Sequence, residues 1–161
     1  MKFSISATVV LLLFSCSLLM GCATFDIETP PQMVAVEKSS DTYVAMTHDG
    51  VVLRANVYSQ GDSSRDVPRG SQEFWVKSTR ERMRTTGGYA LLDETAARSA
   101  DGHEGTRLEF GRDQNGVPYH YWVILFVTDD HIHVIDVGGR QDRFEDAKEA
   151  VQQALASYEV N

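Results

Sequence analysis

Paired histidines are the pattern in this sequence that could do metal chemistry. His131 and His133 lie two residues apart in an apolar run, and alternate residues of a strand share one side at a backbone spacing of about 6.6 Å. Two imidazoles at that spacing can supply two ligands to a metal ion, but a site needs three or four that converge. We therefore predict no metal site and no bound cofactor, and name His131 and His133 as the candidate ligands if a site exists.

Paired acids and hydroxyl groups form no pattern that is typical of an active site. Asp129 and Asp130 are adjacent at a predicted turn, where aspartate is favoured because its side chain bonds to nearby backbone groups. The sequence has no Gly-x-Ser-x-Gly nucleophile motif, no His-Glu-x-x-His zinc motif and no glycine-rich phosphate loop. We therefore predict that the protein is not an enzyme.

The thiol of Cys22 follows an apolar leader. Residues 1–21 begin with the single basic residue Lys2 and continue as an uncharged, mostly apolar run, which is the pattern of a secretory signal peptide. The strongly apolar part, from Ala7 to Met20, is shorter than the roughly 20 residues that span a bilayer, and no cluster of Lys or Arg follows it. We predict that the leader is removed.

Residues Leu19, Met20, Gly21 and Cys22 resemble the lipobox of bacterial lipoproteins, in which a leucine and a small residue precede the cysteine. The resemblance implies that a diacylglycerol is attached to the sulfur of Cys22, that cleavage occurs before Cys22, and that the freed amine takes a further acyl chain such as palmitate. Two or three chains make a stable membrane anchor, since each buried methylene contributes about 0.8 kcal/mol. The alternatives are cleavage by the ordinary signal peptidase after Ala23 and an uncleaved leader.

The residues after Cys22 bear on location. Ala23 stands where an aspartate would resemble the inner-membrane retention signal of Gram-negative bacteria. In such a cell the resemblance implies the outer membrane, with the protein facing the periplasm. Residues 23–32, ATFDIETPPQ, lack apolar periodicity and end in two prolines, so we expect residues 22–32 to form an extended tether. At about 3.1 Å per residue it would reach on the order of 30 Å.

Composition limits what the folded part can be. Removal of residues 1–21 leaves 140 of the 161 residues, enough for one domain with a substantial core, at residues 33–161. Without Lys2 the 15 basic residues become 14, against 23 acidic residues, for a net charge near −9. This charge argues against nucleic acid as a partner, because phosphates need a basic surface. The only cysteines are Cys16 and Cys22, so no disulfide can form within the domain.

The first part of the domain is predicted to be a strand at residues 33–39 and a hairpin at residues 42–58. The hairpin turns at Asp49-Gly50, a dipeptide that suits a two-residue type I′ loop. This register would bury the side chains of Thr42, Val44, Met46, Leu53, Ala55 and Val57. The opposite, solvated side would hold Tyr43, Thr47, Arg54, Asn56 and Tyr58.

A first helix is predicted to begin after the N-cap residue Ser71, to reach about Thr86 and to end at Gly87-Gly88. Its buried stripe is Trp75, Val76, Thr79 and Met83. Its other side carries Lys77, Arg80 and Arg84, which is either a solvated face or a small anionic-ligand patch. Residues 89–92 are a predicted strand and residues 93–104 a predicted loop.

Residues 106–137 carry the most information on strand register. Three apolar strands are separated by turns at Asn115-Gly116 and Asp129-Asp130. With two-residue loops, the opposed pairs are Phe110 with Tyr121, Leu108 with Val123, Leu125 with Val134, and Val127 with Ile132. Both faces of this sheet are then apolar, so both need cover from the helices or the N-terminal segment.

A last helix is predicted from a capping box formed by Asp142 and Glu145. Its apolar residues recur at helical spacing, so one side of the helix should lie against a face of the sheet. They are Phe144, Ala147, Val151, Ala154, Leu155 and Tyr158.

The order of these elements resembles the PsbP-like fold, which is shared by a photosystem II extrinsic protein, the Ran-binding Mog protein and bacterial DcrB-type lipoproteins. The resemblance covers about residues 42–158 and rests on element order and apolar pattern. It implies an α+β domain with an antiparallel sheet of about six strands flanked by two amphipathic helices. It implies no activity, because proteins with this fold do unrelated jobs.

One face of the predicted sheet is the candidate binding face. It carries Trp122, Phe126, Ile135 and Val137, with Arg107 and Glu109 along its flank. If the first helix covers this face it is core; if the cover is partial it is an apolar groove for a partner or a small amphipathic ligand. The leading hypothesis is a non-enzymatic envelope lipoprotein that acts through contacts with an envelope protein. The alternative is a module that binds a small ligand or a metal at the Trp122 face or at His131 and His133.

Overall fold

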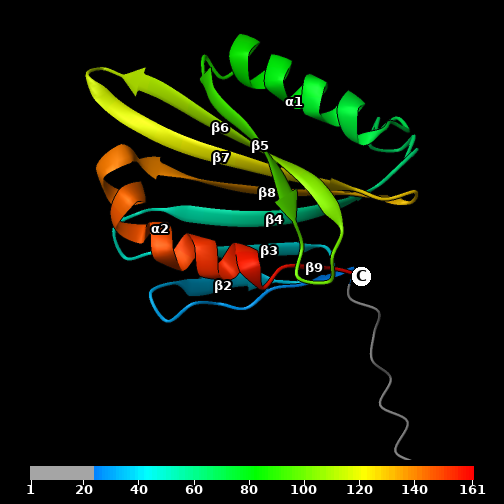
Figure 1. Ribbon diagram of the computed structural model, residues 1–161, viewed down its shortest axis with the longest axis horizontal. Helices are drawn as coiled ribbons and strands as arrows, with labels where there is room; N and C mark the ends of the chain where they lie inside the picture. Colours follow the sequence, from blue (N-terminus) through cyan, green and yellow to red (C-terminus); the bar gives the residue numbers. More distant parts are fainter. Residues whose placement is uncertain (1–23) are drawn as a thin grey trace, which may run out of the picture.

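The structure is a computed structural model that describes residues 24–161 (Figure 1). These residues fold around a seven-stranded antiparallel sheet. The strand order is β2-β3-β4-β8-β7-β6-β5, and a separate two-stranded sheet pairs β1 with β9. The strands are β1 (Phe25–Asp26), β2 (Val34–Lys38), β3 (Thr42–Met46), β4 (Val52–Ser59), β5 (Ala90–Arg98), β6 (Glu104–Gln114), β7 (Val117–Val127), β8 (His131–Arg140) and β9 (Glu159–Val160). The predicted α+β class is confirmed, with seven strands in the main sheet where about six were expected.

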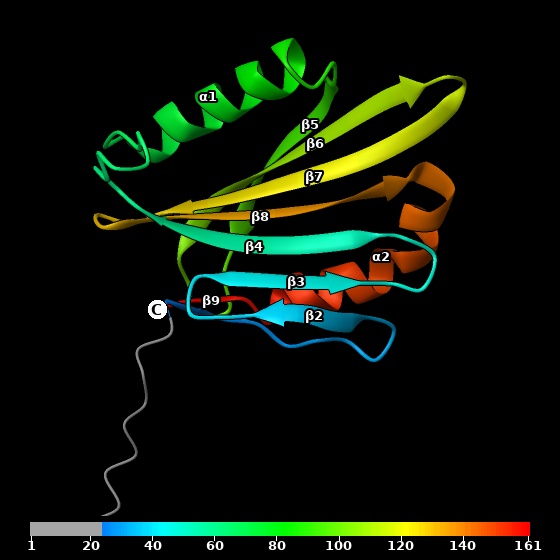
Figure 2. The ribbon, with the colours of Figure 1, turned by 180° about the vertical axis from the view of Figure 1, so that it is seen from behind.

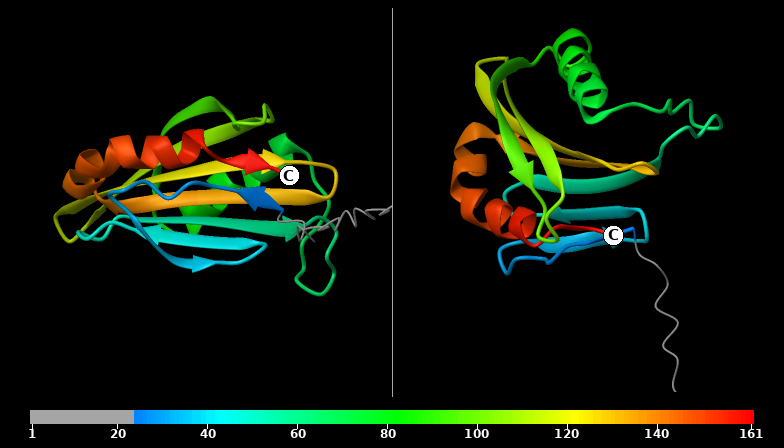
Figure 3. Two further views of the ribbon diagram at one scale, coloured as in Figure 1. Left: turned by 90° about the horizontal axis from the view of Figure 1, so that it is seen from below. Right: turned by 45° about the vertical axis from the view of Figure 1, so that its right-hand side comes forward.

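Two helices lie on opposite faces of the sheet (Figures 1 and 3). Helix α1 (Gln72–Thr85) packs on β5, β6 and β7, and helix α2 (Gln141–Ala156) packs on β7 and β8. Seen from behind, β2, β3 and β4 have no helix in front of them (Figure 2). Among residues 24–161, no helix therefore covers one half of the α1-side face.

Each face has its own apolar core, because strand residues point alternately to the two sides. The core beneath α2 is the larger, and joins side chains of the sheet to Phe144 and Val151 of α2. The core beneath α1 is small and consists of Val76, Leu108, Phe110, Val123 and Leu125. Cover on both faces was predicted and is observed.

The register predicted for the long strands is confirmed. Phe110 lies opposite Tyr121, and Leu125 lies opposite Val134. The turn between β6 and β7 has positive φ at both Asn115 and Gly116, 56° and 80°, which is the type I′ geometry that this dipeptide favours. Here the turn residues and the apolar alternation specify the same register.

The register predicted for the β3–β4 hairpin is wrong by one residue. Met46 lies opposite Val52, and the backbone N–H of Thr47 donates to the carbonyl of Val51 at 2.9 Å, so the loop has three residues. Gly50 has a φ of 93° while Asp49 lacks the positive φ that a type I′ turn requires. A shift of one residue exchanges the faces of a strand, so β3 buries Tyr43 and Ala45 in place of Thr42, Val44 and Met46, and Thr47 directly after the strand is buried on the same side.

Strand β5 replaces the first half of the loop that was predicted at residues 93–104. It runs to Arg98, pairs along its length with β6, and only residues 99–103 form the connection. Most of its side chains are exposed, so no apolar alternation marks it in the sequence. Charged residues such as Asp93 and Glu94 are typical of a sheet edge, where they discourage pairing with other chains.

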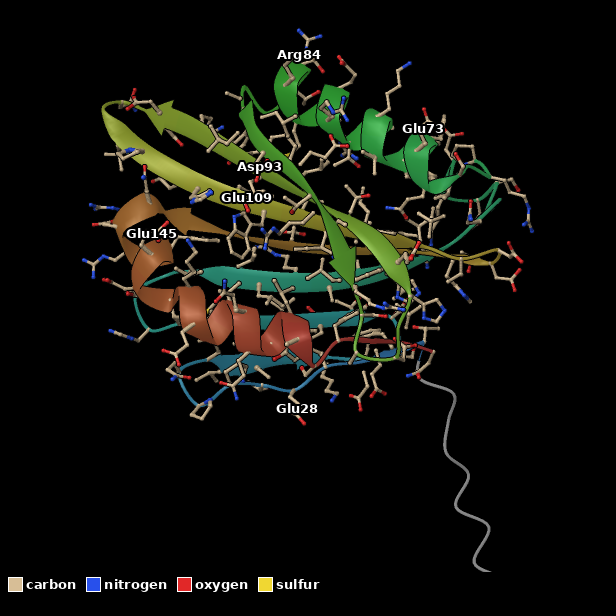
Figure 4. All side chains as sticks on the ribbon, in the orientation of Figure 1. Glu28, Glu73, Arg84, Asp93, Glu109 and Glu145 are labelled. Carbon is tan, nitrogen blue, oxygen red and sulfur yellow. The ribbon has the colours of Figure 1, made fainter. Side chains whose placement is uncertain are left out.

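Helix α1 begins and ends as predicted. The hydroxyl of Ser71 accepts a hydrogen bond from the backbone N–H of Phe74 at 3.2 Å. At the other end Gly88 has a φ of 65°, and the N–H of Tyr89 donates to the carbonyl of Met83 at 3.1 Å. Within the helix only Val76 is buried. Arg84 points outward (Figure 4) and pairs with Glu81, whereas Arg80 pairs with Glu94 of β5.

The capping box predicted for α2 is wrong, although the helix and its buried stripe are present. The helix begins at Gln141 after Arg140, which makes no side-chain capping bond, so Asp142 lies inside the first turn. The carboxylate of Asp142 pairs instead with Arg140 at 3.1 Å. Tyr158 is buried but lies beyond the end of the helix.

The segment predicted as an extended tether is docked on the domain over its described part. Strand β1 pairs with β9, and the side chains of Phe25 and Ile27 are each only 3% exposed. The alternation of Phe25 and Ile27 is too short to be recognised as a strand pattern in the sequence, so their packing against the core was not predicted. The leader at residues 1–21 and the lipobox cysteine lie outside the described residues.

Candidate functional site

The predicted binding face is closed by helix α2. Trp122 is 1% exposed and Phe126 is 3% exposed, while Ile135 and Val137 are fully buried. The ring of Phe144 packs edge-on against Trp122, with the ring centroids 4.9 Å apart. The face is core, which was one of the two outcomes considered. The helix that covers it is the last helix and not the first helix, because the apolar stripe of α2 packs on these side chains.

The two charged residues predicted at the flank of that face, Arg107 and Glu109, lie at its edge and contact the residues that close it. The Arg107 guanidinium lies over the Trp122 ring, 4.7 Å from its centroid, and pairs with Glu109 at 2.9 Å. Glu109 and Glu145 (Figure 4) flank His120, at 3.6 Å and 3.7 Å from its two ring nitrogens. These contacts join β6, β7 and α2, so the predicted rim residues serve to close the face.

A small hollow remains at the edge of this face, between α2 and β5. Its volume is about 200 Å³, and Phe126, Ile135 and Arg107 contribute to its lining together with Ala97 and Leu155. Sites that enclose a small organic ligand usually measure about 300–1,000 Å³. Of the six residues of the predicted binding face, Phe126, Ile135 and Arg107 line this hollow.

The predicted metal-ligand pair is split between the core and its edge. The rings of His131 and His133 are 6.3 Å apart, but His133 is fully buried and its Nδ1 shares a hydrogen bond of 2.8 Å with the Tyr158 hydroxyl. Burial lowers the pKa of His133 to about 4, so its ring is neutral at pH 7. Within residues 24–161, no three side chains of His, Cys, Asp or Glu are placed to hold a metal ion.

A larger hollow lies on the other side of the sheet, between α1 and strands β7 and β8. Its volume is about 560 Å³, within the range of small-ligand sites. Aliphatic side chains of the sheet form its floor, and α1 and the loop before it supply a mixed wall. The floor residues are Val123, Leu125, Ile132 and Val134; the wall includes Arg65, Trp75, Thr79, Arg82 and Met83. We call this hollow the α1 groove.

A half-buried acid, Asp136, lies at the sheet side of the α1 groove. The Tyr121 hydroxyl donates a hydrogen bond to the Asp136 carboxylate, and Arg54 lies 3.5 Å from the same oxygen. Burial raises the pKa of Asp136, and burial beside that carboxylate also raises the pKa of Tyr121. The cluster can bind the polar end of a molecule whose apolar part lies on the aliphatic floor.

Sequence reasoning missed the α1 groove because it assigned this face to the core. The predicted strand register placed Leu125 and Val134 side by side correctly, and cover from a helix or the N-terminal segment was expected over them. The signal that could have revealed the groove is the small number of large apolar residues in the helix, which are Phe74, Trp75, Val76 and Met83. With Val76 as the only buried residue of α1, the helix cannot cover the full width of the sheet.

Beyond the groove, the uncovered half of the α1-side face exposes apolar side chains. Val34 is 66% exposed and Met46 38%, while Tyr58, which also lines the edge of the α1 groove, is 36% exposed. They lie on β2, β3 and β4, the strands that face the viewer in Figure 2. Exposed apolar side chains on neighbouring strands are typical of a surface that contacts another molecule.

Comparison with known proteins yields matches among solved structures. No family model and no curated protein sequence matches the chain. The structure of cyanobacterial PsbP (CyanoP) from Synechocystis aligns over 92% of this chain and 99% of its own, with 15% identity and a TM-score of 0.56. The domain has a PsbP-like fold.

Two further structures share this PsbP-like architecture. LpqN, a protein of Mycobacterium tuberculosis involved in cell envelope biogenesis, aligns over 83% of this chain and 81% of its own, with 14% identity and a TM-score of 0.60. PA94 of Pseudomonas aeruginosa, a protein of unknown function, aligns over 78% and 95%, with 10% identity and a TM-score of 0.51. These likenesses establish the fold alone.

Helices long and apolar enough to cross a bilayer are not found within residues 24–161.

Proposed function

We propose that the protein is a lipid-anchored lipoprotein of the cell envelope that acts through contacts and not by catalysis. The observation that carries this proposal is the Leu19-Met20-Gly21-Cys22 motif at the end of an apolar leader, two residues before the described domain begins at Thr24. Acyl chains on Cys22 would hold the domain at the membrane. In a Gram-negative cell, Ala23 favours the outer membrane with the domain in the periplasm.

The fold is compatible with a role through contacts. The uncovered half of the sheet presents Val34, Met46 and Tyr58 to solvent, and a partner with an apolar centre would bury them. The LpqN structure, which has a similar fold, is of a protein involved in cell envelope biogenesis. Both facts support an envelope protein that works by binding an envelope partner.

Replacing Cys22 with serine tests the anchor. Cells that express the natural protein and are fed labelled palmitate should incorporate the label into the chain, and the chain should sediment with membranes. The Cys22→Ser variant should carry no label above background, because a hydroxyl is not alkylated in place of the thiol. A mature natural protein with a free N-terminus at Thr24 would contradict the proposal, since it would indicate cleavage by the ordinary signal peptidase.

A second function, the binding of a small amphipathic ligand, is favoured by the α1 groove. Its aliphatic floor suits an acyl or alkyl chain, and Asp136 with Tyr121 provides a polar end. Arg65 and Arg82 also line the groove and would favour an anionic headgroup. This site replaces the Trp122 face of the earlier hypothesis, whose side chains are buried beneath α2.

The two tryptophans allow this second function to be tested. Trp75 lines the α1 groove and Trp122 lies in the other core, and they are the only two tryptophans in the chain. In the Trp122→Phe variant a nitroxide-labelled fatty acid should quench the remaining tryptophan emission in a saturable way. In the matched Trp75→Phe variant the same probe should quench far less. Equal quenching in both variants, or none, would exclude the groove as the site.

A further inference from the structure

We infer that the domain sits end-on at the membrane surface, with the end formed by β1, β9 and the turn between β2 and β3 against the lipid headgroups. This inference rests on the proposed lipidation of Cys22. It departs from the extended tether that the sequence suggested, because that segment is docked on the domain from its first described residue. The partner of this surface is the headgroup layer of the bilayer that holds the acyl chains.

Apolar contacts hold the docked segment. The ring of Phe25 stacks on the ring of Tyr158, with centroids 5.6 Å apart and planes 15° from parallel. Tyr158 in turn stacks on Phe126 at 5.8 Å. Since Phe25 and Ile27 are each 3% exposed, pulling this segment away would expose two large apolar side chains to water, which is unfavourable.

Hydrogen bonds fix the docked segment from three directions. The Thr24 backbone N–H donates to the Ser40 carbonyl at 3.3 Å, and the Thr24 carbonyl accepts from the Asn161 N–H at 3.2 Å. A few residues on, the Glu28 N–H donates to the Ser157 hydroxyl at 2.9 Å. An ion pair of 3.6 Å between Lys38 and Asp26 lies beside them. The chain is therefore held at the domain surface from Thr24 onward.

The distance from this end to the anchor is short. Cys22 precedes Thr24 by two residues, and a fully extended chain spans at most about 3.6 Å per residue, or roughly 7 Å for the two. The first described residues and the C-terminus lie side by side, as Figures 1 and 3 show, and the Glu28 label in Figure 4 marks the segment that follows β1. Acyl chains on Cys22 must therefore enter the bilayer beside this end.

The opposite end of the sheet lies far from the membrane in this arrangement. The loop of residues 99–103 belongs to the docked end, because the Ala100 N–H donates to the Tyr158 carbonyl at 2.7 Å and Asp101 accepts from the Val160 N–H at 3.0 Å. Strand β6 starts directly after this loop and has 11 residues. At a rise of about 3.4 Å per residue its far end at Gln114 is on the order of 35 Å away.

Charge does not supply the attraction. Near the docked end lie the acidic residues Asp26, Asp41, Asp101 and Glu159, against the basic residues Lys38 and Arg98. An acidic surface is not drawn to anionic lipid. The acyl chains alone must bring this end to the headgroups, which makes the orientation a consequence of the short connection.

Single labelled cysteines test the orientation. Ser40→Cys places a thiol at the docked end and Gln114→Cys at the far end, both at exposed positions. Because Cys16 would be removed with the leader and Cys22 would be alkylated, the new thiol is the only one free to react with a fluorophore. The lipidated protein is reconstituted into phosphatidylcholine vesicles that contain a headgroup-nitroxide lipid. Quenching should be several-fold stronger at residue 40 than at residue 114.

Flotation with the vesicles separates the two possible failures. Protein that floats but shows equal quenching at both positions, or stronger quenching at residue 114, overturns the orientation while leaving the anchor intact. Protein that does not float overturns the anchor and the orientation with it. A Phe25→Ala, Ile27→Ala variant adds a check, since undocking residues 24–27 lengthens the connection: it should still float, with quenching at residue 40 falling toward that at residue 114.

Discussion

Replacing Trp122 with alanine should cost about 3–5 kcal/mol of unfolding free energy, the range for large aromatic side chains in a packed core. Trp122 is 1% exposed and is enclosed by Phe144, by the Arg107 guanidinium and by His120, whose Nε2 accepts the indole N–H at 3.3 Å. A domain of this size has a total stability of about 5–15 kcal/mol. The urea midpoint followed by circular dichroism should therefore fall sharply.

An exposed residue provides the control for this variant. Leu92 is 60% exposed on β5, so Leu92→Ala should change the unfolding free energy by less than about 0.5 kcal/mol. An equally small change for Trp122→Ala would mean that α2 does not cover this face in solution. The comparison also matters for function, because any loss of binding in Trp122→Ala would report a loosened core and not a removed contact.

Lowering the pH from 7 to about 4.5 should destabilise the domain through His133. Burial lowers the pKa of this ring from 6.5 to about 4. Between pH 6.5 and pH 4 the ring is therefore protonated in the unfolded chain but neutral in the folded chain. Stability rises with pH wherever the unfolded state binds more protons, so lowering the pH through this range destabilises the folded domain. The full difference amounts to about 3 kcal/mol, lost progressively as the pH drops below 6.5. Urea unfolding at a series of pH values measures it.

The His133→Gln variant should flatten this pH dependence, because an amide does not titrate and can still bond to the Tyr158 hydroxyl. His131→Gln is the matched control, since that ring lies at the edge of the core and not within it, and its slope should stay close to the natural one. Acids with a lowered pKa, such as Asp101 and Asp49, lose their stabilising effect only as the pH falls below about 4. An unchanged slope in His133→Gln would assign the effect to other groups.

The two hairpins show where sequence reasoning succeeds. At Asn115-Gly116 both residues adopt the positive φ of a type I′ turn, and every predicted pair between β6 and β7 is observed. At Asp49-Gly50 the Thr47 side chain bonds to Asp49 and to the Val51 N–H, which stabilises a three-residue loop. The Asp49-Gly50 dipeptide is compatible with either a two-residue or a three-residue loop. Both faces of β3 carry apolar residues, so neither the turn residues nor the apolar pattern decides the register of this hairpin.

The same contrast applies to the candidate sites. The face that carries Trp122 and Ile135 could be recognised from alternation, but alternation does not tell which helix covers it or how completely. Helix α2 closes that face because a continuous stripe from Phe144 to Ala154 packs on it. Helix α1 has one buried residue and leaves the α1 groove beside it.

By itself the sequence determined the α+β class, the register of β6, β7 and β8, the two helices, and the cysteine motif that predicts a lipid anchor. These features depend on neighbouring residues: turn conformation, capping and apolar period. Only the tertiary structure decided that the Trp122 face is core, that β5 extends the sheet, and that Phe25 and Ile27 dock on the domain. Those outcomes depend on contacts between residues far apart in the chain, such as Phe25 with Tyr158, for which local patterns carry no signal.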